Sequence, residues 1–107
     1  MNIHTNNDEK CTYALQDLYN VYDPEIGLNI VDLGLVYQLY FDEAGKGLTC
    51  LMTLTTQFCP MGDAITADTR SSLNRAFPDW EITLNLTFDP PWNWNMISPE
   101  GREFLGR

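Results

Sequence analysis

Histidine, basic residues and long apolar runs are scarce in this sequence, and each scarcity excludes a class of protein. The one histidine, His4, lies in a polar N-terminal stretch, so a single chain does not supply a complete tetrahedral zinc site. The 6 lysines and arginines are scattered among 15 acidic residues, and this argues against a nucleic-acid partner because phosphate binding needs clustered cations. No apolar run has the length of a membrane span, and residues 1–10 lack the apolar core of a secretion signal. We therefore expect a soluble cytoplasmic protein with no membrane partner.

The three cysteines indicate neither a disulfide framework nor a zinc ribbon, because their number is odd and no C-x-x-C spacing occurs. Cys11 and Cys50 fall on the predicted core-facing sides of their elements, where free cysteine commonly fills space. Cys59 differs, since it follows a strand and precedes a helix start at Pro60. Unpaired N–H groups and the helix dipole favour a thiolate there, the form that binds soft metals and attacks electrophiles. The alternative is that Cys59 only caps the helix weakly.

The apolar periodicity predicts a single α+β domain over residues 1–107, in which residues 1–7 form a flexible tail. With 44% hydrophobic and 20% charged residues, the chain is typical of a globular protein. The expected order is α-β-β-α-β-α, a two-layer arrangement in which helices cover one face of a small sheet. The elements are a helix that ends at Asp23-Pro24, strands over 35–41 and 48–54 joined as a hairpin, a helix from Pro60 to Pro78, a strand over 80–88 and a short helix from Ser98 to near Gly106.

Four polar residues are candidates to surround the Cys59 thiol. Turn chemistry explains Asp23, and solvation explains Glu25, which together flank a helix-ending proline. Thr55 and Thr56 suit a strand, but their hydroxyls could also hydrogen-bond a ligand held at Cys59. Carboxylates near a thiolate oppose nucleophilic catalysis but suit a cation, and mixed thiolate and carboxylate ligation of iron is chemically sensible.

The loop over residues 89–97 contains two tryptophans, Trp92 and Trp94. Two interpretations have equal weight from the residues alone. The rings either pack back onto the core or form a partner surface, since tryptophan is enriched among the residues that anchor interfaces. Earlier in the chain, Asp32 is expected to fix a turn and Gly34 to adopt a positive φ.

Three sequence segments, in order, resemble the signatures of one known family. They are DPEI at 23–26 with NIVDLGLVY at 29–37, TLTT at 53–56 with CPM at 59–61, and DPPW at 89–92 with MIS at 96–98 and Arg102. The chain is similar to the metal–sulfur cluster biosynthesis domain family (MIP-eighteen-like, formerly a domain of unknown function), which includes SufT-like and PaaD-like proteins. It departs from that pattern at Gln57-Phe58, where many members have Pro-Gly. The cysteine-rich C-terminal extension of PaaD-type members is absent, which favours the general assembly-factor branch.

The resemblance implies an assembly factor for iron–sulfur proteins rather than a turnover enzyme. It implies that Cys59 is the reactive or ligating thiol, that Asp23, Glu25, Thr55 and Thr56 surround it, and that iron or an iron–sulfur cluster is held transiently. The implied partners are iron–sulfur assembly proteins and recipient apo-proteins. Because clusters usually take four protein ligands, two copies of Cys59 in a homodimer would be one solution. The other is a persulfide or transient metal on Cys59.

Two further functions stay open from the residues. In the first, the chain is a non-enzymatic adapter that binds partners through Trp92, Trp94 and its acidic surface. In the second, it is a cysteine-dependent hydrolase or transferase. The second ranks last, because no histidine other than His4 exists to act as a general base.

Overall fold

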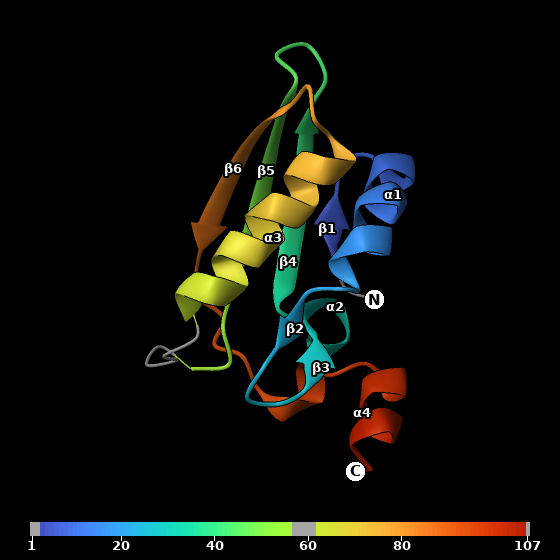
Figure 1. Ribbon diagram of the computed structural model, residues 1–107, viewed down its shortest axis with the longest axis vertical. Coiled ribbons are helices and arrows are strands. Elements are labelled where there is room, and N and C mark those ends of the chain that lie inside the picture. Colours follow the sequence, from blue (N-terminus) through green and yellow to red (C-terminus); the bar gives the residue numbers. More distant parts are fainter. Residues whose placement is uncertain (1–2, 57–61, 107) are drawn as a thin grey trace.

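A sheet in the strand order β1-β4-β5-β6 forms the centre of the computed structural model, which describes residues 3–56 and 62–106 (Figure 1). A second, two-stranded sheet pairs β2 with β3. The elements are β1 (His4–Thr5), α1 (Asp8–Leu18), β2 (Tyr22–Asp23), β3 (Leu28–Asn29), α2 (Ile30–Leu33), β4 (Val36–Asp42), β5 (Gly47–Met52), α3 (Gly62–Ala76), β6 (Glu81–Leu86), the 3-10 helix η1 (Trp94–Met96) and α4 (Pro99–Leu105). The predicted α+β class is confirmed.

The antiparallel hairpin of β4 and β5 confirms the strand pair expected from alternation, with Leu39 opposite Cys50 and Phe41 opposite Leu48. These side chains are buried on the helix-covered face of the sheet. The alternation of the strand expected over residues 35–41 is interrupted at Tyr37. A bulge between Val36 and Gln38 shifts the register, so Val36 is buried and Tyr37 is only half-buried. One extra residue reverses the side to which the following side chains point.

Helices α1 and α3 pack on the same face of the sheet and against each other (Figure 1). The side chain of Asn7 caps α1 by accepting from the Lys10 N–H at 3.0 Å, and Cys11, Ala14 and Leu18 form its buried face. The helix ends at Leu18, earlier than the predicted end at Asp23-Pro24, because the chain turns there and enters β2. None of the described helices is long and apolar enough to cross a membrane.

The chain returns from α3 into β6, which pairs parallel to β5 from Gly47–Glu81 to Met52–Leu86. The strand predicted over 80–88 is therefore confirmed, although it is shorter and lies at a sheet edge. At the other edge, His4 and Thr5 pair parallel with β4 as β1, and Asn6 exchanges two hydrogen bonds of 2.8 Å with the backbone of Phe41. The prediction of a flexible tail over residues 1–7 is corrected for this part of the chain.

The last helix begins and ends as predicted. The Ser98 Oγ accepts from the Gly101 N–H at 3.0 Å, Pro99 is the first helical residue, and Gly106 closes α4 in the left-handed region at φ 74°. Besides β1, four short elements were not predicted, because each is too short to show a periodicity: β2, β3, α2 and η1. They lie with α4 beyond one end of the main sheet (Figure 1).

Candidate functional site

The segment that carries the predicted thiol, Cys59, lies outside the described residues, which end at Thr56 before it and resume at Gly62 after it. The two flanks nevertheless meet. Gly62 is buried, and a Cβ atom placed on it would approach the Leu54 side chain to 2.9 Å. Thr55 is half-buried and Thr56 is exposed. The two described flanks of the Cys59 segment, the end of β5 and the start of α3, are therefore close together.

Asp23 is almost fully buried, with 1% of its surface exposed, at the end of β2, where the turn into β3 begins. Its Oδ1 accepts from the Glu25 N–H at 2.9 Å, and its carbonyl accepts from the Gly27 N–H at 2.7 Å. The turn interpretation of Asp23 thus agrees with the structure. Its second oxygen, Oδ2, is buried and has no hydrogen-bond partner in the described part of the chain. That oxygen is available to a cation or to a hydrogen-bond donor.

Glu25 is exposed at the tip of the same turn. The β2–β3 turn, the end of β5 and the start of α3 all lie at one end of the main sheet, so the structure brings the four predicted polar residues to the same end of the molecule (Figure 1). Within residues 3–56 and 62–106, however, no three His, Cys, Asp or Glu side chains converge to hold a metal ion. A metal bound by the described residues alone is therefore not indicated.

The NIVDLG segment has a structural role that the sequence only partly predicts. Asp32 Oδ2 accepts from Asn29 Nδ2 and Oδ1 accepts from Ser98 Oγ, each at 2.7 Å. The Asp32 carbonyl also accepts from the Ser98 N–H at 2.7 Å. Asp32 therefore fastens α2 to the start of α4. The sequence identified Ser98 as a helix cap, but no local pattern reveals a partner 66 positions away.

Gly34 closes α2 in the left-handed region at φ 80°, which confirms the predicted positive φ. A Cβ atom at Gly34 would collide with the Met96 carbonyl oxygen. Tyr37 also contacts this segment, since its hydroxyl donates to the Pro90 carbonyl at 2.8 Å and lies 3.6 Å from the Met96 sulfur. Burial raises the pKa of Tyr37, partly opposed by a hydrogen bond with Thr53. The hydroxyl therefore stays a donor at neutral pH.

The two tryptophans of the 89–97 loop have different environments, and each fits one of the two predicted roles. Trp92 packs against the core, and its Nε1 donates to the Leu33 carbonyl at 2.6 Å. Trp94 is 49% exposed and stands edge-on to Trp92, with ring centroids 5.2 Å apart. The partner-surface prediction is therefore compatible with Trp94, whereas Trp92 has a packing role.

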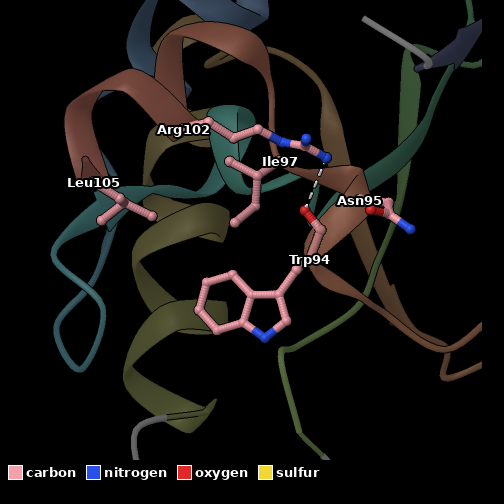
Figure 2. Close-up of a pocket in the computed structure, with 5 residues that line it drawn as sticks. All are labelled: Trp94, Asn95, Ile97, Arg102 and Leu105. Carbon is pink, nitrogen blue, oxygen red and sulfur yellow. Dashed lines mark hydrogen bonds between the residues drawn. The ribbon is translucent and has the colours of Figure 1, made fainter. Parts of the chain in front are cut away.

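Beside Trp94 lies a pocket of about 230 Å³, which Figure 2 shows in close-up. The Trp94 indole, Ile97 and Leu105 supply its apolar walls. Arg102 crosses above them and donates from Nη2 to the Trp94 carbonyl at 3.3 Å. Sequence reasoning missed this pocket because its residues are separated along the chain by the turn into α4.

The two described thiols are core residues, as predicted. Burial raises the pKa of Cys50 to about 12, and its side chain is fully enclosed. Burial also raises the pKa of Cys11, with a smaller opposing effect from a hydrogen bond to Thr5 and a further increase from the Asp8 charge. Neither thiol is suited to ionise or to react in the folded protein.

A thiol count tests this assignment. At pH 8 we expect an aromatic disulfide reagent to label one thiol per chain quickly, and all three after unfolding in urea. The fast thiol is expected to be Cys59, so Cys59→Ser should remove the fast phase entirely. A second fast thiol in the folded protein would contradict the burial of Cys11 and Cys50.

Comparisons with known proteins agree on one family. The family model described as iron-sulfur cluster assembly protein matches residues 14–83. A protein of Porphyromonas gingivalis named Fe-S protein maturation auxiliary factor is 41% identical over 83% of this chain and 84% of its own length. A Staphylococcus aureus protein named Fe-S protein maturation auxiliary factor SufT is 38% identical over 80% of this chain and 97% of its own length. Among solved structures, a domain of unknown function from Bacillus anthracis is 34% identical with a TM-score of 0.85, and the match covers 92% of this chain and 93% of that one.

Proposed function

The chain belongs to the iron–sulfur cluster assembly protein family, and on that premise we propose that it carries, transfers or helps to deliver iron or clusters through the Cys59 thiol. Its relatives are named as auxiliary factors in the maturation of iron–sulfur proteins, which supports a role in assembly and maturation. Iron or the cluster is then the cargo of the protein.

The observation that carries the proposal is the separation of the three thiols. Cys11 and Cys50 are committed to the core, with 6% and 0% of their surfaces exposed. Cys59 falls in sequence between two described flanks that meet at Leu54 and Gly62. A soft thiolate supplies affinity for iron. The Oδ2 of Asp23, which has no hydrogen-bond partner among the described residues, is a hard donor at the end of the molecule where the two flanks lie.

One thiol per chain does not complete a cluster, because clusters usually take four protein ligands. Two proposals for the remaining ligands follow. In a homodimer, two Cys59 thiolates would act with carboxylates or external thiols. Alternatively, Cys59 receives a persulfide or a single iron and passes it on. The recipient in either case is an apo-protein or another assembly protein.

Anaerobic reconstitution with ferrous iron and sulfide tests the role of the thiol. We expect Cys59→Ser to bind less than half of the iron bound by the unchanged protein and to lack its visible absorption. Cys11→Ala is the matched control, since it removes a thiol that the structure places in the core. Equal iron binding by the unchanged protein and Cys59→Ser would contradict the proposal.

An adapter function is the second candidate, and the exposure of Trp94 beside the 230 Å³ pocket favours it. An exposed aromatic ring next to an apolar pocket and an arginine has the composition of an interface anchor. In this case purified assembly proteins would bind Cys59→Ser as tightly as the unchanged chain and would bind Trp94→Ala more weakly. Weaker binding of Cys59→Ser together with unchanged binding of Trp94→Ala would favour the proposed role of the Cys59 thiol.

A further inference from the structure

The outer edge of β6 carries backbone hydrogen-bonding groups that no strand in the described ranges uses. The Glu81 N–H donates to the Lys46 carbonyl and the Thr87 N–H to the Met52 carbonyl, each at 2.9 Å. Backbone groups alternate in direction along a strand, so the odd-numbered residues of β6 face β5. The N–H and carbonyl groups of Ile82, Leu84 and Leu86 therefore point away from the sheet.

The contact of Arg70 with this edge confirms that the backbone groups of the even-numbered β6 residues point away from the sheet. Its Nη1 reaches from α3 to the Ile82 carbonyl at 3.2 Å, which is possible only if that carbonyl faces outward. This contact covers the beginning of the edge. The groups of Leu84 and Leu86 lie beyond it, on the outermost strand of the sheet (Figure 1).

Proteins usually protect an exposed edge strand with lysine, proline, a bulge or extreme shortness. The opposite edge of this sheet follows that rule, since β1 has two residues. In contrast, β6 has six residues, contains neither lysine nor proline, and keeps an unbroken register with β5. It is therefore a regular template for another strand.

The side chains beside this edge are apolar on one face and polar on the other. Ile82 and Leu84 are half-buried on the helix-covered side, and Leu86 is 46% exposed there. On the open face, Thr83 and Asn85 are exposed. A partner strand paired with the outer edge of β6 would therefore place every second one of its own side chains beside the apolar side chains of Ile82, Leu84 and Leu86.

The charges around β6 decide between the occupants. Asp79 and Glu81 are exposed at its beginning and Asp89 shortly after its end, while Arg70 already contacts the edge. A second copy of a chain with net charge −9 would bring like charges together, whereas a cationic segment would be attracted. We propose that the β6 edge binds an extended, cationic segment of a partner protein, with alternating apolar residues, by strand addition.

Amide hydrogen exchange measured by NMR tests this on the whole chain. The probe is a blocked heptapeptide of alternating lysine and valine. We expect a saturating amount to slow exchange at the Ile82, Leu84 and Leu86 amides by about tenfold or more, because these N–H groups gain partners. A heptapeptide of alternating glutamate and valine, and a lysine–valine peptide with a central proline, should leave them unchanged. Unchanged exchange with the first peptide, or protection that rises with protein concentration without any peptide, would overturn the proposal.

Two matched variants separate strand addition from simple charge attraction. Leu86→Lys places a cation beside the open edge and should weaken lysine–valine binding by about tenfold. Tyr40→Lys adds the same charge at a residue of β4 that is 50% exposed, and should leave binding nearly unchanged. Equal weakening by both variants would show that the peptide binds through charge alone and would overturn the proposal. Neither variant alters Cys59, so this outcome is independent of iron binding.

Discussion

Gly34→Ala is expected to destabilise the protein by about 3 kcal/mol, because two costs add. The left-handed backbone at φ 80° strains any residue with a Cβ atom. The new methyl group also collides with the Met96 carbonyl oxygen, which belongs to the backbone and cannot rotate away. Met96 must move, and it is held by its own N–H bond to the Asn93 carbonyl at 3.0 Å. Urea unfolding followed by tryptophan fluorescence measures the loss.

Gly27→Ala is the matched control for this prediction. Gly27 has nearly the same backbone angle, φ 82°, but nothing lies within 4 Å of the position of its Cβ atom. Only the backbone strain remains, so the expected loss is about 1 kcal/mol. Equal losses for the two variants would show that the close approach to Met96 does not contribute to stability.

Trp92→Ala should destabilise the protein by about 3 kcal/mol, since it removes a large ring from the packed junction between the 89–97 loop and α2. Trp92→Phe keeps most of the ring but leaves the Leu33 carbonyl without its 2.6 Å donor, and it should cost about 1 to 2 kcal/mol. Thermal unfolding of both variants gives the size of each contribution.

Trp94→Ala is the control for Trp92→Ala. Its ring is half exposed, so truncation removes chiefly the edge-on contact with Trp92 and should cost about 1 kcal/mol. A loss as large as that of Trp92→Ala would show that Trp94 is also a core residue. The adapter function would then lose the surface on which it depends.

The sequence predicted the parts of the fold that have a long and regular pattern. The hairpin of β4 and β5, the strand β6 and the capped helix α4 all follow from alternation or from terminal residues such as Ser98 and Gly106. It did not predict β1, because two residues carry no periodicity. It extended α1 beyond Leu18, because Tyr22 continued the apolar spacing although its side chain is exposed in β2.

For the candidate site, the sequence indicated which residues to consider, but not which residues they contact in the folded chain. Asp23 was expected in a turn and lies where one begins, but the burial of its Oδ2, which has no hydrogen-bond partner in the described ranges, depends on tertiary packing. The role of Trp92 could not be separated from that of Trp94, because both are tryptophans of the same loop. Only the tertiary structure shows that Trp92 packs against the core and donates to the Leu33 carbonyl, whereas Trp94 is half exposed. Whether Cys59 holds cargo stays a prediction, since it lies outside the described residues.

The double connection between Asp32 and Ser98 has a consequence for how this chain varies in evolution. Each residue satisfies the other through a side-chain bond and a backbone bond, both 2.7 Å long. A change of the side chain at one position leaves a hydrogen-bond donor or acceptor without a partner at the other, so selection should act on the two positions together. Positions 32 and 98 are therefore expected to be substituted together across related sequences, with Asn29 following them, although long stretches of chain between them drift independently.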